Sequence, residues 1–176
     1  MKKLFLSAAM LLCMLLNAMK KFIILFSFLL GIVVTAYGQK ISYDGSDGME
    51  WQFKRCYMKG ETCIVDLVVT NMGRKDMSYT LFWFPDAGTT GIVAYDDEGN
   101  TYNYQNIRGT FGKAEFGKHN VYDLVVPREV SLKLHCEIRD FDEFAAMIKV
   151  LKFPLWNNTT HTGCSLQIKD IPIPRE

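Results

Sequence analysis

The segment Val130-Ser-Leu-Lys-Leu-His-Cys-Glu-Ile138 alternates apolar and polar side chains from end to end. Successive side chains of a β-strand point to opposite faces, so this pattern predicts a strand with one face in a core and the other in water. On that interpretation Leu134, Cys136 and Ile138 are buried. A sheet with one apolar face needs a second layer to cover it.

The same period of two recurs along most of the chain after residue 50, which indicates a protein built from strands. Strands are expected at residues 51–57, 62–71, 78–84, 92–95, 101–105, 121–125, 130–138, 147–153 and 165–173. Pro172 and Pro174 end the last of these, and proline cannot donate to a ladder, so that strand should lie at a sheet edge or bend as it ends. Residues 140–146 alone favour a helix, of about one turn, with Asp140 as its cap.

Short strands at regular spacing with almost no helix predict an all-β fold. We expect an immunoglobulin-like antiparallel β-sandwich of about 7–9 strands. Trp83 is a candidate for the buried aromatic residue between the sheets. The antibody pattern itself is missing, because the spacing from Cys63 to Trp83 is long and Cys136 falls on the fifth major strand.

The first 38 residues are typical of a secretory signal, written twice. Lys2-Lys3 and Lys20-Lys21 each stand directly before an apolar run. Residues 22–35 supply the apolar core and residues 36–38 the small side chains, which predicts translation from Met19 and cleavage before Gln39. Each run is shorter than the ~20 apolar residues of a spanning helix. We therefore expect export to the periplasm, the outer surface or the medium, with no membrane span after cleavage.

The remaining residues, 39–176, are expected to form one domain. Four of the 20 basic residues lie in the signal region, so 16 remain against 19 acidic residues and the mature charge is −3 with histidine neutral. Nucleic-acid binding needs clustered Lys and Arg. No such cluster occurs in the sequence, so a nucleic-acid partner is not expected.

The mature chain keeps four cysteines, in a compartment where disulfides persist. These disulfide candidates are Cys56, Cys63, Cys136 and Cys164. A two-residue turn at Lys59-Gly60 would place Cys56 opposite Cys63, whereas a loop longer by one residue would separate them and unite the apolar faces instead. By alternation Cys63 and Cys136 both point into the core, where they either bridge neighbouring strands or pack as small hydrophobes.

No set of residues for catalysis, metal or cofactor binding is evident. His135 falls on a polar strand face and His119 and His161 in loops, without the spacing of a zinc site. There is no Gly-x-Ser-x-Gly elbow. The acidic segment 96–100 lacks the alternating ligands of a calcium loop and predicts a hairpin turn. An enzyme is therefore not expected.

Aromatic residues gather around the Gly-rich segment 108–117 and before an Asn-rich loop. As a long loop, the Gly-rich segment could present rings to a sugar or a protein. Alternatively it folds back and buries Phe111 and Phe116. The candidate contacts are Tyr102, Tyr104, Phe111, Phe116 and Trp156.

A family resemblance follows from two motifs, the strand and turn at residues 62–76, ending in Thr-Asn-Met-Gly-Arg-Lys-Asp, and the hairpin Ala94-Tyr-Asp-Asp-Glu-Gly-Asn-Thr-Tyr102. They resemble small exported immunoglobulin-like domains of Bacteroidetes-type bacteria and the telokin-like domains of bacterial lipoproteins. The resemblance implies the sandwich fold and brings no catalytic residues. Our hypothesis is a non-enzymatic module that binds protein or glycan at the cell envelope; the alternative is a structural envelope domain that pairs through a sheet edge.

Overall fold

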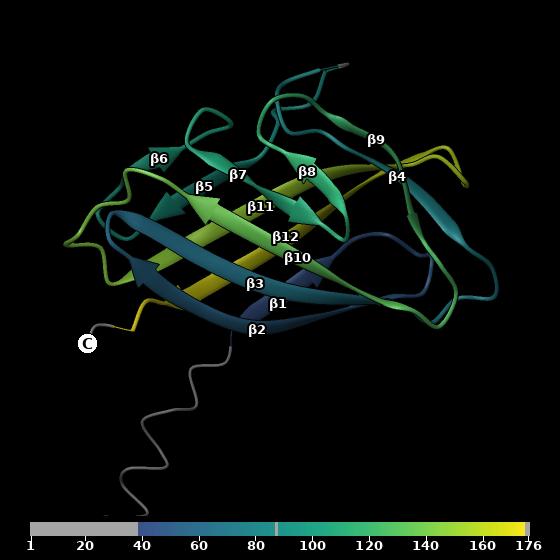
Figure 1. The fold of residues 1–176 in the computed structure, drawn as a ribbon, viewed down its shortest axis with the longest axis horizontal. Coiled ribbons are helices and arrows are strands. Elements are labelled where there is room, and N and C mark those ends of the chain that lie inside the picture. The colour runs from purple at the N-terminus through teal and green to yellow at the C-terminus, as the bar shows by residue number, and fades with distance from the viewer. Residues whose placement is uncertain (1–38, 87, 175–176) are drawn as a thin grey trace, which may run out of the picture. The chain divides into compact units, whose positions relative to one another are not determined.

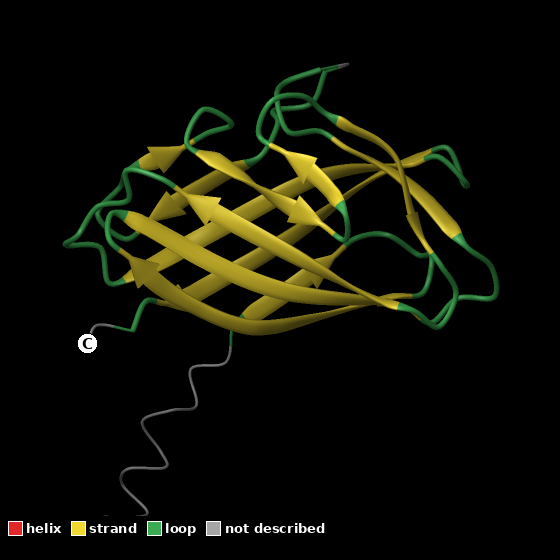
Figure 2. Ribbon diagram, viewed as in Figure 1, coloured by secondary structure: helices red, strands yellow, loops and turns green. Residues whose placement is uncertain are grey.

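β-Strands are the only regular secondary structure in the computed structural model of the chain, which describes residues 39–86 and 88–174 (Figure 2). The expected signal region lies outside these residues. The strands are β1 (Lys40–Tyr43), β2 (Met49–Lys59), β3 (Thr62–Asn71), β4 (Met77–Leu81), β5 (Val93–Asp96), β6 (Thr101–Tyr102), β7 (Ile107–Phe111), β8 (Ala114–Phe116), β9 (Val121–Val126), β10 (Ser131–Ile138), β11 (Met147–Asn157) and β12 (Thr162–Pro172). The described part of the chain has no helix long and apolar enough to cross a membrane.

The strands form two antiparallel sheets stacked as a sandwich, which confirms the all-β prediction. One sheet has seven strands: the order β1-β12-β11-β4-β9, with β5 also pairing with β11 and with β6. The other has five, in the order β2-β3-β10-β7-β8. Figure 1 shows β2, β3 and β10 crossing over β11 and β12. The core fills the space between these two layers.

The strand β10 has the two faces that its alternation predicts. Leu134, Cys136 and Ile138 are buried, while Lys133 is exposed and His135 half-buried on the opposite face. The neighbouring strand β3 buries its alternate residues in the same way, and the two strands pair along their whole length. The largest buried side chains of the other sheet, such as Phe153, cover this apolar face.

The β2–β3 hairpin follows neither predicted register. Its turn is Gly60-Glu61, with Lys59 opposite Thr62 and Gly60 at φ 59°. A glycine with positive φ at the first turn position suits the twist of hairpin strands. Farther from the turn than Cys56, the register shifts at a bulge between Phe53 and Arg55. Before the bulge the more buried residues of β2 are the odd-numbered ones, such as Trp51 and Phe53, and after it they include the even-numbered Cys56 and Met58.

Two further expectations are wrong. Residues 140–146 form no helix: Asp140 has φ 52°, which an N-cap residue does not adopt, and Asp142 caps the turn instead by accepting from the Phe144 N–H at 2.8 Å. Phe141 is buried against Tyr102 with ring centroids 4.8 Å apart, and this packing fixes the segment in a non-helical course with one turn at residues 143–144. The Gly-rich segment is also no long loop, because β7 and β8 pair there as a hairpin.

The last strand is not at an edge. β12 lies between β1 and β11, so the expected edge position is wrong, and Pro172 is its final residue. The neighbouring strand β11 carries a proline of its own. Pro154 lies between the stretch that pairs with β5 and the stretch that pairs with β4, and its carbonyl accepts from the Phe82 N–H at 3.1 Å. Proline has no N–H to return a second bond to Phe82, and the regular pairing of β11 with β4 ends one residue away, at Leu155 and Leu81.

Candidate functional site

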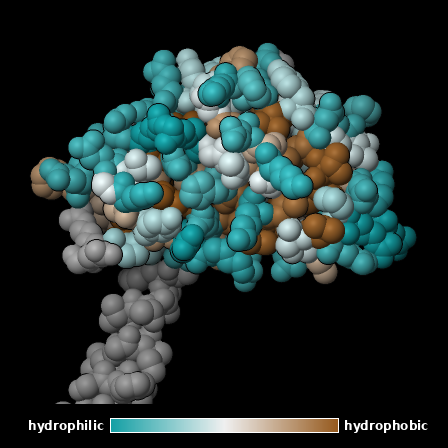
Figure 3. All heavy atoms as spheres, viewed as in Figure 1, coloured by the Kyte–Doolittle hydropathy of each residue, from teal (hydrophilic) through white to brown (hydrophobic). Residues whose placement is uncertain are grey.

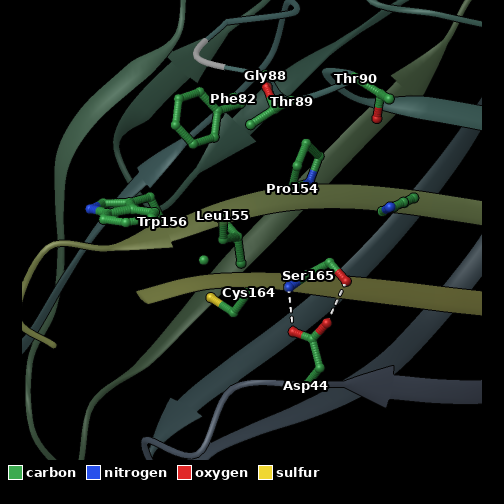
Figure 4. Close-up of a pocket in the computed structure, with 12 residues that line it drawn as sticks. Asp44, Phe82, Gly88, Thr89, Thr90, Pro154, Leu155, Trp156, Cys164 and Ser165 are labelled. Atoms are coloured by element: carbon green, nitrogen blue, oxygen red, sulfur yellow. Dashed lines mark hydrogen bonds between the residues drawn. The ribbon is translucent and has the colours of Figure 1, made fainter. Parts of the chain in front are cut away.

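A hollow of about 760 Å³ lies against β11 and β12 of the seven-stranded sheet (Figure 4). We call it the Trp156 hollow. The segment after β1 and the loop between β4 and β5 complete its walls. The lining residues are Asp44, Phe82, Gly88, Thr89, Thr90, Lys152, Pro154, Leu155, Trp156, Gly163, Cys164 and Ser165.

Two aromatic side chains line this hollow: Phe82 is buried, whereas 39% of Trp156 is exposed. It alternates along β11 with the core residues Leu155 and Asn157, so its ring points away from the core. Its partner on β12 is Gly163, where an added Cβ would lie 3.8 Å from the indole Cε3 atom. The indole therefore lies over the glycine of the neighbouring strand. Together with Pro154, it gives the hollow an apolar floor.

Polar groups surround this floor and are held by local hydrogen bonds. The Asp44 carboxylate accepts from the Ser165 N–H at 2.5 Å and from its Oγ–H at 2.9 Å, the two bonds drawn in Figure 4. Thr89 closes a turn by donating its N–H to the Asp86 carbonyl at 2.8 Å. Lys152 is half-buried on β11. Asp44 and Thr89 therefore need little reordering to contact a ligand, which lowers the entropic cost of binding.

The Asp47 carboxylate, in the segment between β1 and β2, holds the wall of the hollow that follows β1. Asp47 Oδ2 accepts from the Tyr43 hydroxyl at 2.7 Å, the Tyr79 hydroxyl at 2.5 Å and the Asn157 side-chain amide at 2.8 Å. Tyr79 and Asn157 are 3% and 1% exposed. Burial raises the pKa of both tyrosines, so they remain donors at neutral pH. The cluster joins β1, β4 and β11 and thereby positions Asp44.

Of the five aromatic candidates, Trp156 alone lines this hollow. Phe111 and Phe116 are 1% and 4% exposed and Tyr102 is also buried, as in the alternative where the segment folds back. Tyr104 is half-buried with its ring edge-on to Trp83. Trp83 packs at the margin of the core and donates Nε1–H to the Ile107 carbonyl at 2.6 Å.

Apart from Trp156, the residues that line the hollow were not predicted from the sequence. Its other lining residues come from separate strands and loops, and their neighbourhood depends on the sheet order. One signal was available: within β11, Lys152, Pro154 and Trp156 share the face opposite Phe153 and Leu155. An exposed tryptophan beside a proline on one strand face indicates a surface that is not packed against the core.

The four mature cysteines are buried and unbonded in this structure. Cys63 and Cys136 are core residues, as predicted. The Cys56 and Cys63 sulfur atoms lie 3.5 Å apart, although the register set by the Gly60-Glu61 turn places Cys56 opposite Val65. Cys164 stands apart, with its Sγ 3.5 Å from the Tyr43 hydroxyl. Burial raises the pKa of Cys164 to about 11, so it is a thiol rather than a nucleophilic thiolate at neutral pH.

The acidic segment 96–100 is a turn closed by its own hydrogen bonds. Asp96 Oδ1 accepts from the N–H groups of Glu98 at 3.0 Å and Asn100 at 2.8 Å, and Oδ2 accepts from the Tyr102 hydroxyl at 2.8 Å. Burial alone would raise the pKa of Asp96, but the hydrogen bonds from Asn100 and Tyr102 lower it below its ordinary value. Both carboxylate oxygens of Asp96 are thus engaged within the turn.

Comparisons with known proteins identify no relative by sequence. No family model matches the chain, and no curated protein matches it. Two solved structures show a distant likeness. A Northeast Structural Genomics Consortium target has a TM-score of 0.36 at 9% identity, over 77% of this chain and 86% of that one. A family 123 glycoside hydrolase from Clostridium perfringens has a TM-score of 0.34 at 10% identity, over 78% of this chain and 28% of that one.

Proposed function

We propose that residues 39–176 are an exported, non-enzymatic binding module that takes a saccharide in the Trp156 hollow. The observation that carries the proposal is the indole of Trp156, 39% exposed over Gly163 and surrounded by fixed polar groups. Binding sites of this kind combine apolar and aromatic area with a few placed polar side chains. Export rests on the signal pattern of residues 1–38.

A saccharide matches the chemistry of this hollow. A pyranose ring presents one face of C–H groups, which pack on the π-face of an indole, and a rim of hydroxyl groups that both donate and accept. Trp156 and Pro154 supply the apolar floor. Lys152 can donate, Asp44 can accept, and Thr89 can do both around that floor.

The immunoglobulin-like identity is part of the same proposal, and the strand order supports it. The order β2-β3-β10-β7 corresponds to strands A-B-E-D of the immunoglobulin fold, and β4-β11-β12 corresponds to C-F-G. Of the five additional strands, β1 then precedes A, and β5, β6, β8 and β9 lie in the connections between C and E. No cysteine occurs on β11, so the B–F disulfide of antibody domains has no counterpart here.

The alternative, pairing through a sheet edge, has less support because the described edge strands are short or bulged. β1, β6 and β8 contain 4, 2 and 3 residues. The longer edge strand β2 is bulged between Phe53 and Arg55, and β9 is interrupted at Asp123, which has φ 52°. Short strands and bulges are devices that prevent edge-to-edge association.

A saccharide screen followed by calorimetry tests the proposal. We expect a saccharide that binds the wild type, and we expect Trp156→Ala to weaken binding at least about tenfold, or 1.4 kcal/mol. Tyr122→Ala is the matched control, because Tyr122 is 60% exposed on β9 and does not line the hollow. Equal affinities of the wild type and Trp156→Ala, or a screen in which no saccharide binds the wild type, would contradict the proposal.

A further inference from the structure

A second hollow, of about 640 Å³, lies over β7, β8 and β10 in the five-stranded sheet. The surface seen in Figure 3 is mainly hydrophilic. Basic and imidazole side chains outnumber carboxylates in this hollow: it is lined by Arg108, Lys118, His119, His135 and Arg139 against Glu115 and Glu137. Residues 39–176 as a whole carry more acidic than basic side chains, 19 against 16. The hollow is therefore a local basic region on an acidic domain.

Glu137, the carboxylate on β10, is engaged by its own partners. Its Oε2 atom accepts from Arg108 Nε–H at 2.6 Å, and its Oε1 atom lies 3.5 Å from His135 Nε2. The other ring nitrogen of His135 lies 2.6 Å from Asp66, which also binds Arg55. Burial alone would raise the pKa of Glu137, but these partners lower it below its ordinary value. The network fixes Arg108 and His135 in place.

Two cations of the hollow remain available. Within residues 39–86 and 88–174, no carboxylate lies in ion-pairing distance of Arg139 or Lys118. Arg139 is half-buried directly after β10, and its backbone N–H donates to the Asn106 carbonyl at 2.9 Å. A half-buried guanidinium without a carboxylate partner favours an anion beside it.

The chain between β8 and β9 is shaped to bring Lys118 to the same place. Gly117 has φ 128°, and a Cβ there would lie 2.5 Å from Arg108 Cβ. Only glycine allows this backbone angle and this close approach. The chain thus passes tightly over Arg108 and carries Lys118 to the rim of the hollow.

We propose that this basic hollow binds an oxyanion, either a free ion such as sulfate or a sulfate or carboxylate group carried on a saccharide. Arg139 would bind two of its oxygen atoms through the guanidinium fork, and Lys118 would donate from the rim. His119 lies beside Lys118 at the same rim. The site is on the other sheet from the Trp156 hollow, so the proposal stands independently of the function proposed above.

The test is an ¹⁵N-amide NMR titration of residues 39–176 with sodium sulfate, with a sulfated disaccharide, and with sodium chloride at matched ionic strength. We expect saturable shifts at Gly117, Lys118 and Arg139 with the sulfate probes only. The double variant Lys118→Gln/Arg139→Gln should weaken binding at least about fivefold. Lys113→Gln is the control, because Lys113 is exposed in the turn between β7 and β8 and does not line the hollow.

The two sulfate probes also identify the source of the anion. Tighter binding of the disaccharide than of sulfate supports a saccharide-borne group, and equal binding supports recognition of the ion alone. Shifts that chloride reproduces, or binding that the double variant retains, would overturn the proposal. Amide spectra of the variants show directly whether they are folded.

Discussion

Replacing Asp47 with alanine should destabilise the domain by about 3 kcal/mol, because a buried donor left without an acceptor costs about 1–3 kcal/mol. Two of the three groups that donate to Asp47 Oδ2 are buried, the Tyr79 hydroxyl and the Asn157 amide. The third, the Tyr43 hydroxyl, is half-buried and can reach water, so its loss contributes little. Urea unfolding at neutral pH measures the change in the free energy of unfolding.

Two further variants make the reasoning specific. Asp47→Asn keeps one acceptor oxygen and should fall between the wild type and Asp47→Ala. Tyr79→Phe removes one donor, so adding Asp47→Ala to it should cost less than Asp47→Ala costs alone. A loss below about 1 kcal/mol in Asp47→Ala, or full additivity of the two changes, would refute the account of this cluster.

Three other predictions follow from the strands and turns. Gly109→Ala should destabilise the fold by about 2 kcal/mol or more in urea unfolding, because an added Cβ would collide with a backbone carbonyl of β10. Gly163→Ala is the control and should be nearly neutral, because its added Cβ meets only indole carbons at 3.8 Å or more. The pKa of Asp96 is lower in the folded state than in the unfolded state, so the carboxylate stabilises the fold above the ordinary pKa of 3.8, and this contribution is lost as pH falls below that value. On acidification, the urea midpoint of unfolding of Asp96→Asn should therefore decline less than that of the wild type. Refolding in an oxidised glutathione buffer should join Cys56 to Cys63, because their sulfur atoms are 3.5 Å apart. Peptide mass spectrometry identifies the first disulfide that forms, and a bond that includes Cys164 would contradict this prediction.

The strands that the sequence predicted well are those with one wet face. In β10 and β3 the alternation of side chains directly reflects burial on one side, so both strands and their faces could be read from residue order. The turn after β2 was misplaced by one residue. The change from Trp51 and Phe53 to Cys56 and Met58 as the apolar positions of β2 was the available sign of its bulge.

The remaining differences arise from contacts between distant segments. Residues 140–146 carry a helix-like cap pattern, but burial of Phe141 against Tyr102 outweighs a propensity worth only one turn. The Trp156 hollow depends on β1, β11, β12 and the loop after β4 meeting at one surface. Trp156 was a candidate from the sequence, whereas Asp44 and Phe82 join it only once the sheet order is known.

The measurement that tests the proposed function most directly is ¹⁹F NMR of the domain labelled with 5-fluorotryptophan. The chain contains three tryptophans, and Trp156 alone lines the hollow, since Trp51 and Trp83 pack against the core. Trp156→Phe assigns its resonance. Titration with a saccharide from the screen should shift the Trp156 signal saturably and leave the other two nearly unchanged. A bound saccharide that shifts Trp51 or Trp83 and not Trp156 would contradict the proposal.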